Sequence, residues 1–226
     1  MSNMTPQQLR RGIRSVTGFK AKGGERFDSI IEGFRIDGGS RLFIPWAAPA
    51  DGREAVGSPE KDTVGWLGEE LPQIFGSIGR ITTRVMFADR YAEMNGFDME
   101  LANRYYDQVR ELWQNLVSQS GITLEFTRAS QVIEGEPDLD LGRDKLNDLK
   151  PELREKILKA ARKYGGEVDG ETAAARYCAM RFTEAQSVAD EGQLWVSLNW
   201  PERDAMTGDA PRMYVPGGAR TPWSKS

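Results

Sequence analysis

Short apolar runs alternate with a helical pattern along the first half of the chain. Residues 41–46 (RLFIPW), 81–88 (ITTRVMFA) and 122–127 (ITLEFT) are rich in β-branched and other apolar side chains, which is typical of buried strands. Between the first two runs, apolar residues recur at three- and four-residue spacing over residues 62–78. This spacing predicts a helix, which Pro72 kinks or interrupts.

A long helix is predicted between the second and third strands. Asp98 is a suitable N-cap, and Gly121 is placed to end the helix at the C′ position. One face of this helix carries apolar residues: Leu101, Tyr105, Val109, Leu112 and Leu116. The order of strand, helix, strand, helix and strand is the pattern of a right-handed parallel βαβαβ unit. We therefore expect an α/β fold with a doubly wound parallel sheet and helices on both faces.

The second half of the chain is expected to be mainly helical. Residues 134–149 are acidic and are expected to form a loop, after which Pro151 opens a helix that carries five basic side chains. A further helix is expected over residues 171–189 and a strand over residues 193–198. The charge of the basic helix has two interpretations, an ordinary solvated face or a surface for an anionic partner.

The predicted organisation is a single α/β domain between two short terminal segments. Residues 1–24 form a basic arm or short helix, residues 25–210 hold the domain, and residues 211–226 form a tail rich in Pro and Gly. No stretch approaches the roughly 18 apolar residues that span a bilayer, and no signal-peptide pattern is found, so we expect no membrane association. One cysteine, Cys178, cannot form an intrachain disulfide, which favours a cytoplasmic protein.

The composition narrows the chemistry that the protein can perform. The chain of 226 residues contains no histidine, which excludes Ser-His-Asp and Cys-His triads, HExxH zinc sites and haem on a proximal imidazole. Acid–base chemistry must therefore fall to Asp, Glu, Tyr, Lys or Cys side chains or to the substrate. A formal net charge of -4 argues against nucleic-acid binding over the whole surface but permits a local basic face.

Two loops follow predicted strands and are candidates for a binding site. In an open parallel sheet, ligands bind beyond the carboxyl ends of the strands. The segments at the ends of the first two predicted strands are residues 45–52 and 89–96. Neither GxGxxG nor GxxxxGK[ST] occurs there, so a dinucleotide fingerprint and a Walker-type phosphate loop are both absent. Asp89 stands at a strand tip, where its carboxylate is placed either to hold a substrate amine or ribose hydroxyl, or to cap a short turn.

The chain contains residues 87–96 (FADRYAEMNG) and 121–124 (GITL) and, between them, the pair Tyr105 and Tyr106. Together these residues resemble the catalytic core of tyrosyl- and tryptophanyl-tRNA synthetases. In that class I core, a strand ends in Ala-Asp-x-x-Ala and feeds a helix rich in Arg and Tyr. The same strand-tip Asp occurs in cyclodipeptide synthases, which resemble those synthetases but use already charged tRNA. The resemblance covers residues 42–127 and implies a Rossmann-like domain.

The missing activation signatures favour the cyclodipeptide synthase type. Class I synthetases activate amino acids with a HIGH sequence after the first strand, and residues 45–52 contain nothing like it. The resemblance thus implies tRNA-dependent aminoacyl transfer with amide bond formation, on aminoacyl-tRNA and a small amino-acid substrate, without a metal or other cofactor. Cyclodipeptide synthases carry a serine nucleophile in the same loop, whereas residues 45–52 hold no Ser, Thr or Cys. We therefore expect direct transfer to a bound acceptor.

The resemblance also implies site residues. Glu184 matches the glutamate of a Tyr-x-x-x-Glu pair on a late helix, and Tyr177, one turn before Met180, takes the place of the tyrosine; these two are the candidates for moving the proton. The expected substrate-binding residues are Trp46, Asp51, Asp89, Arg90, Asn95 and Tyr105. The expected contacts to the tRNA acceptor stem are Arg154, Lys156, Lys159, Arg162 and Lys163.

Two other functions remain open on the same fold. One is a nucleotide-dependent ligase or nucleotidyl transferase, which predicts thermal stabilisation by ATP. The other is a binding protein that kept the fold and lost catalysis. Substitutions of Asp89 and Glu184 separate this last possibility from the enzymes, because binding would then survive in both variants.

Overall fold

The sheet is the frame of the molecule. A computed structural model describes residues 5–16, 20–49, 53–118, 120–164, 169–198 and 211–214. Six strands pair in the order β1-β6-β5-β2-β3-β4, all parallel except β1 against β6. Their bounds are β1 Lys20–Lys22, β2 Gly39–Trp46, β3 Arg80–Phe87, β4 Ile122–Arg128, β5 Leu194–Ser197 and β6 Arg212–Tyr214.

The strand order confirms the Rossmann-like class. Counted among themselves along the chain, the five parallel strands have the spatial order 3-2-1-4-5, which is that of a doubly wound dinucleotide-binding sheet. The chain leaves β2 toward one edge of the sheet through β3 and β4, and it returns to the other side of β2 with β5 and β6. The topological switch point therefore lies between β2 and β5.

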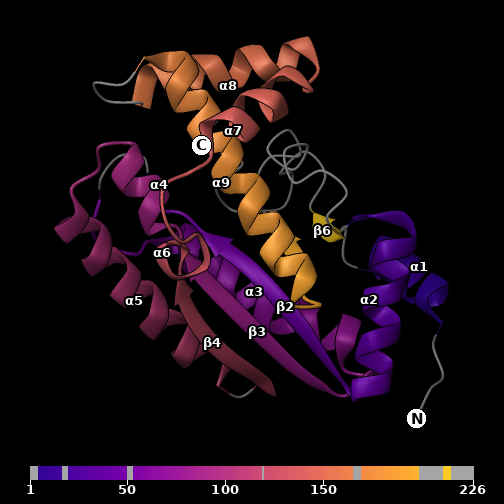
Figure 1. Ribbon diagram of the computed structural model, residues 1–226. Helices are drawn as coiled ribbons and strands as arrows, with labels where there is room; N and C mark the ends of the chain where they lie inside the picture. Colours follow the sequence, from indigo (N-terminus) through magenta and orange to yellow (C-terminus); the bar gives the residue numbers. More distant parts are fainter. Residues whose placement is uncertain are drawn as a thin grey trace.

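Helices cover both faces of the sheet (Figure 1). Their bounds are α1 Pro6–Val16, α2 Gly24–Asp37, α3 Ser58–Phe75, α4 Asp89–Met94, α5 Met99–Val117, α6 Ala129–Val132, α7 Leu139–Asn147, α8 Pro151–Tyr164 and α9 Gly170–Asp190. Alternate side chains of β2 show the division. Ile44 packs in a core cluster with residues of α1, α2, α3 and α5, whereas Phe43 packs in a second cluster with Met180 and Val188 of α9.

A third cluster builds a helical cap, by which we mean α7, α8 and the amino-terminal part of α9. Leu146, Ile157, Leu158 and Ala174 are buried together in it. Figure 1 shows α7 and α8 on the same side of the molecule as α4 and α6, which directly follow the carboxyl ends of β3 and β4. The cap therefore stands on the side of the sheet where ligands bind in this class of fold.

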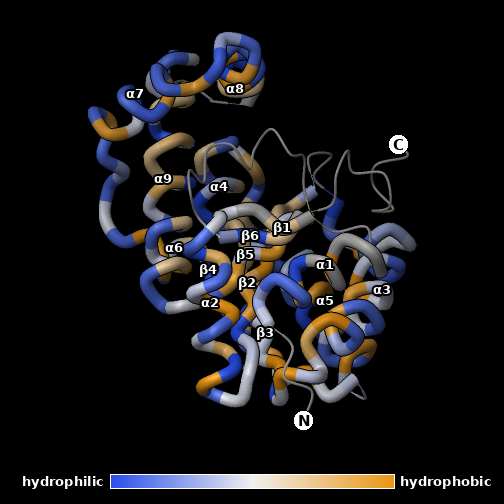
Figure 2. Tube along the Cα trace, turned by 90° about the vertical axis from the view of Figure 1, so that its right-hand side faces the viewer, coloured by the Kyte–Doolittle hydropathy of each residue, from blue (hydrophilic) through white to orange (hydrophobic). Residues whose placement is uncertain are grey.

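Hydropathy along the chain trace agrees with these layers. Figure 2 shows hydrophobic positions gathered in the middle of the molecule, along β2, and around α5, while α7 and α8 are largely hydrophilic. None of the helices in the described part of the chain has the length and apolar composition needed to cross a lipid bilayer.

The structure confirms the strands and long helices expected from the sequence. They are the strands β2, β3, β4 and β5 and the helices α3, α5, α8 and α9. The Asp98 carboxylate accepts hydrogen bonds from the backbone N–H groups of Glu100 and Leu101, as an N-cap does. The expected role of Gly121 is wrong, because α5 ends at Val117 and Gly121 instead takes a left-handed conformation, with φ of 75°, just before β4.

Other elements differ from expectation. Most of the loop expected over residues 89–96 is the short helix α4. The acidic segment expected as a loop contains α7, whose start is capped by the Asp138 carboxylate. The helix α2 has no predicted counterpart. Part of the segment expected as a tail forms β6, whose Met213 is fully buried between β5 and β1.

Candidate functional site

A pocket lies at the topological switch point. It has a volume of about 180 Å³ and is lined by residues 45–49, which end β2 and follow it, by Leu198 just beyond β5, and by Arg53, Glu60 and Tyr105. We call it the switch-point pocket. Its place beyond the carboxyl ends of β2 and β5 is where open α/β sheets bind their ligands.

A chain of buried hydrogen bonds runs along one wall of this pocket. The indole Nε1 of Trp46 donates to the Tyr105 hydroxyl at 3.1 Å, and that hydroxyl donates to Glu60 Oε1 at 3.2 Å. The Glu60 carboxylate also accepts from Arg53 Nη2 at 2.5 Å and from the Gly57 backbone N–H at 2.8 Å. Burial raises the pKa of Tyr105 well above its ordinary value, so the hydroxyl stays protonated and keeps donating.

The local sequence explains how these groups meet. Glu60 stands in the first turn of α3 and reaches back to the Gly57 N–H, as the glutamate of a capping box does. Tyr105 lies on the buried face of α5, and Trp46 is the last residue of β2. The described lining offers a carboxylate, a guanidinium, a phenol and an indole, but neither a thiol nor an aliphatic hydroxyl. It is therefore suited to non-covalent binding of a polar group beside aromatic rings.

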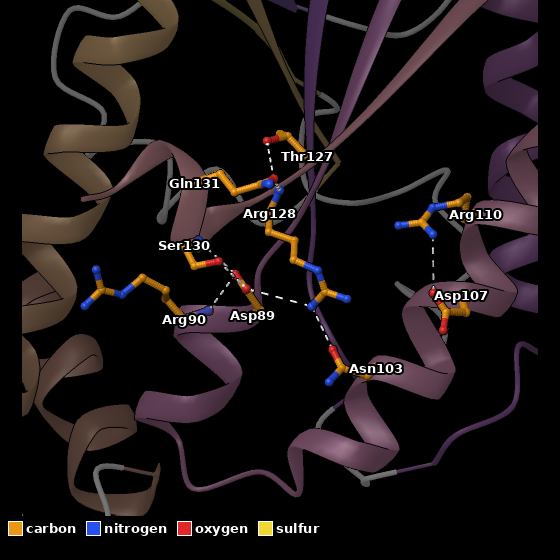
Figure 3. Close-up of polar contacts among 9 residues, drawn as sticks. All are labelled: Asp89, Arg90, Asn103, Asp107, Arg110, Thr127, Arg128, Ser130 and Gln131. Atoms are coloured by element: carbon orange, nitrogen blue, oxygen red, sulfur yellow. Dashed lines mark hydrogen bonds and ion pairs between the residues drawn. The ribbon is translucent and has the colours of Figure 1, made fainter. Parts of the chain in front are cut away.

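Asp89 forms a separate polar cluster at the tips of β3 and β4 (Figure 3). Its carboxylate accepts hydrogen bonds from Ser130 Oγ at 2.6 Å, the Ser130 backbone N–H at 3.0 Å and the Arg90 backbone N–H at 2.9 Å. Arg128 Nη1 stands 3.8 Å from it and donates to Asn103. This geometry ties α4 to the start of α6 and corresponds to the capping role that the sequence left open, so substrate binding by Asp89 stays a prediction.

The other expected residues near Asp89 lie in different surroundings. The Arg90 guanidinium donates to the carbonyl oxygens of Ile133 and Gly135, at 2.7 and 2.6 Å, and holds the chain after α6. Asn95 is half-buried at the end of α4, where its backbone N–H donates to the Tyr91 carbonyl oxygen. Asp51 lies outside the described residues.

Glu184 is fully buried between α9 and α4. Its Oε2 accepts hydrogen bonds from the Tyr91 hydroxyl at 2.6 Å and from Arg181 Nη1 at 2.9 Å. The second candidate, Tyr177, packs edge-on against the Tyr91 ring, with the ring centroids 5.8 Å apart. Tyr91 thus joins the two candidate catalytic residues.

The electrostatics of this cluster are set mainly by burial. Burial raises the pKa of Glu184, against the opposing effects of the Arg181 charge and the Tyr91 hydrogen bond. Burial and then the Glu184 charge raise the pKa of Tyr91 well above its ordinary value. Within the part of the chain that the structure describes, Glu184 Oε1 and Arg181 Nε are buried without a hydrogen-bond partner. The cluster shares no residue with the described lining of the switch-point pocket.

The basic residues of α8 lie on the helical cap. Ile157 and Leu158 turn inward, whereas the charged side of α8 faces solvent. Arg154 is half-buried and stands 3.6 Å from Glu171, and Arg162 stands 3.8 Å from Glu155. The remaining basic side chains of the helix are exposed: Lys156, Lys159 and Lys163. The structure therefore gathers the five expected cations on one solvent-facing helix.

Several residues of these clusters were not expected as site residues from the sequence, among them Arg53, Glu60, Tyr91, Arg128, Ser130 and Arg181. Glu60 carried one usable signal, its three-residue spacing from Gly57 at a helix start. Tyr91 is far from Glu184 in the chain, so no local pattern pairs them. Among the described residues, no group of three or more acidic or cysteine side chains is arranged to hold a metal ion.

Comparisons with known proteins place the fold. No family model and no curated protein sequence matches the chain. The structure is similar to the PvcA protein from Pseudomonas aeruginosa, with a TM-score of 0.61 and 12% identity over 93% of this chain and 83% of that one. It is also similar to tyrosyl-tRNA synthetase complexed with L-tyrosine from Archaeoglobus fulgidus, with a TM-score of 0.57 and 11% identity over 94% of this chain.

The chain spans 64% of the length of that synthetase. A third similarity, to a CDPS from Fluoribacter dumoffii, has a TM-score of 0.40 and 12% identity, over 77% of this chain and 88% of that one. At these identities the comparisons show the fold alone. The two similarities with TM-scores above 0.5 confirm the resemblance at the level of the fold: the chain has a Rossmann-like α/β fold that is similar to that of a tyrosyl-tRNA synthetase.

Proposed function

We propose that the protein is an enzyme of aminoacyl transfer, which takes the aminoacyl group of an aminoacyl-tRNA and joins it to an amine as an amide. The observation that carries this proposal is the switch-point pocket, in which the buried Glu60 carboxylate stands beside the aromatic side chains of Trp46 and Tyr105. The Glu60 carboxylate is paired with Arg53, and aromatic rings beside this pair favour a cationic group. The α-ammonium of an aminoacyl group has this charge.

The reaction requires the protein to do little to activate its substrate. In an aminoacyl-tRNA the carboxyl group is already an ester, so the acceptor amine attacks the ester carbonyl and the tRNA 3′-terminal ribose leaves as its hydroxyl. The amine loses one proton and the leaving oxygen gains one. Glu184 and Tyr177 remain our candidates for this transfer, supported by the burial that raises the pKa of Glu184. Because their cluster shares no residue with the described lining of the switch-point pocket, we propose that the reacting ester and amine lie between the two.

The helical cap supplies a surface for the RNA part of the substrate. The basic side of α8 faces solvent on the side of the molecule where α4 and α6 follow the carboxyl ends of β3 and β4. Phosphate contacts by lysine and arginine give affinity that falls steeply with salt. We therefore expect tRNA binding to weaken in Lys159→Ala and with added salt, while Lys61→Ala, which removes an exposed lysine of α3, leaves it unchanged.

The test uses purified protein and a mixture of charged tRNAs. Liquid chromatography with mass spectrometry measures amide products and the loss of aminoacyl groups from the tRNA. The proposal predicts a new amide in the wild type and a slower rate in Glu184→Gln and Tyr105→Phe. A product yield equal to that of a reaction without protein, with no faster deacylation, would contradict it.

The same assay separates the alternatives. A nucleotide-dependent ligase would form product from a free amino acid only when ATP is added, and ATP would raise its melting temperature. A binding protein would retain charged tRNA in Asp89→Asn and Glu184→Gln, with no turnover in the parent. Each outcome selects a different function for one fold.

A further inference from the structure

A second polar cavity lies far from the switch-point pocket along the strands. It has a volume of about 410 Å³ and opens on the sheet face that α9 covers. Its lining includes five charged residues and one buried amide: Arg41, Arg80, Arg84, Glu125, Glu191 and Gln193. We call it the arginine cavity. In Figure 1 the amino-terminal parts of β3 and β4 lie open toward the viewer, beside the end of α9.

Strand register gathers the charged groups on one face. Arg84 of β3 stands opposite Glu125 of β4, and Arg41 of β2 stands opposite Thr82, two residues before Arg84. Side chains at such positions project from the same side of a sheet. The chain turns after α9 through Gly192, which takes a left-handed φ of 64° and so presents Glu191 and Gln193 to the cavity.

The three arginines differ in their ion pairs. Arg84 is held at both sides, by Glu191 at 2.5 Å and by Glu125 at 3.3 Å. Arg41 pairs with Asp37 at 2.9 Å. Within the described ranges, the guanidinium of Arg80 makes neither a hydrogen bond nor an ion pair. Among the described residues, the cavity therefore holds one cation without an ion-pair partner, Arg80, beside the ion-paired group of Arg84, Glu125 and Glu191.

Gln193 adds a buried acceptor. Its side chain is only 5% exposed, and its Nε2 donates to Glu191 Oε2 at 2.7 Å. Its Oε1 is buried with no donor among the described residues. A buried acceptor without a partner is destabilising, so a ligand N–H or O–H that donates to this oxygen gains affinity from the new hydrogen bond.

We propose that the arginine cavity binds a small carboxylate that carries an amino or hydroxyl group on the neighbouring carbon. The ligand carboxylate pairs with Arg80, as planar guanidinium groups favour, and the neighbouring N–H or O–H donates to Gln193 Oε1. The three lining arginines are balanced by the two lining glutamates and by Asp37, the ion-pair partner of Arg41, so a ligand with one carboxylate adds less uncompensated charge than a phosphate dianion. This site is separate from the proposed reaction and does not depend on it.

Three small molecules with the same carbon skeleton test the proposal: L-alanine, lactate and propionate. They differ at the second carbon, which carries an ammonium group in zwitterionic alanine, a hydroxyl group in lactate and a hydrogen atom in propionate, so lactate and propionate form the charge-matched pair. Ligand titrations followed by NMR measure affinity at constant ionic strength. We expect saturable binding of alanine and lactate, and binding of propionate weaker by about tenfold, the effect of one hydrogen bond of about 1.4 kcal/mol.

Variants assign the binding to the cavity. Arg80→Gln should weaken the binding of alanine and of lactate by about tenfold or more. Arg26→Gln, which removes an exposed arginine of α2, should leave both affinities unchanged. Gln193→Met should remove the preference for lactate over propionate. The thermal melt of each variant without ligand confirms that it is folded, and Arg80 is exposed enough to be replaced safely.

Several results would overturn the proposal. They are no saturable binding of any probe, equal affinity in wild type and Arg80→Gln, or alanine binding that survives Arg80→Gln but is lost in Tyr105→Phe. The last result would assign the amino acid to the switch-point pocket and would support the proposed function while refuting the second site.

Discussion

Removing one oxygen atom from Tyr105 tests the hydrogen-bond chain of the switch-point pocket. In Tyr105→Phe the ring keeps its place in the core, where Tyr105 is 2% exposed. The Trp46 indole N–H loses this acceptor, at 3.1 Å, and Glu60 Oε1 loses a donor at 3.2 Å. The volume of the side chain hardly changes, so the effect reports the hydrogen bonds rather than packing.

The magnitude follows from the two bonds. A neutral hydrogen bond contributes about 1 kcal/mol to folding, and one to a charged group contributes about 1.5–3 kcal/mol. Glu60 keeps its bonds to Arg53 and to the Gly57 N–H, so its carboxylate is not left alone. We therefore expect the free energy of unfolding to fall by about 2–4 kcal/mol.

Urea unfolding followed by far-UV circular dichroism measures this difference. Tyr177→Phe is the matched control, because the described contacts of Tyr177 are ring packing rather than a hydrogen bond of its hydroxyl. The control should change stability by less than about 0.5 kcal/mol. A loss below 1 kcal/mol in Tyr105→Phe, or an equal loss in both variants, would refute the reasoning.

Three further predictions concern the helical cap and α9. Burial raises the pKa of the Cys178 thiol to about 12, so a thiol reagent at pH 8 should modify it slowly in the native protein and fully in denaturant; rapid native labelling would contradict this. Gly142→Ala should lower the melting temperature by several degrees, because its methyl group meets the Ala175 carbonyl oxygen, whereas Gly33→Ala, with open space around it, should be neutral or stabilising by up to about 1 kcal/mol. Because burial raises the pKa of Glu184, its contribution to stability is fully present below the unfolded value of about 4.3 and is lost as pH rises through the folded value. Urea unfolding from pH 4 to pH 8 should therefore show the wild type losing stability relative to Glu184→Gln. A gain in the stability of the wild type relative to this variant would contradict the prediction.

The parts of the fold that could be predicted are those with a strong local pattern. The strands β2, β3 and β4 are apolar runs bounded by turn residues, and α5 combines an apolar face with Asp98 as its cap. The helix α7 was missed because only Gly142 and Leu146 of it are buried. Its contact with α9 lies far along the chain, so its nine residues alone appear as an acidic loop.

The candidate site divides in the same way. Trp46 and Tyr105 could be chosen because one ends a strand and the other lies on an obvious helix face, and the structure places them in hydrogen-bond contact. Glu60 and Arg53 could not, because a glutamate in a first helical turn and an arginine in a loop are ordinary features of a sequence. The contact of Glu60 with Tyr105 depends on how α3 packs against α5, which is a tertiary property.

The strand β6 has a consequence for the order of assembly. It fills the space between β5 and β1, so that Lys20 pairs with Tyr214 across almost the whole chain. Contacts of such long sequence separation form late and slowly. Until β6 has been synthesised and has docked, β1 lacks its partner and β5 presents an open edge, which is a template for pairing with another chain. Nascent and refolding molecules are therefore most exposed to intermolecular pairing at this one edge, although the rest of the sheet has already formed.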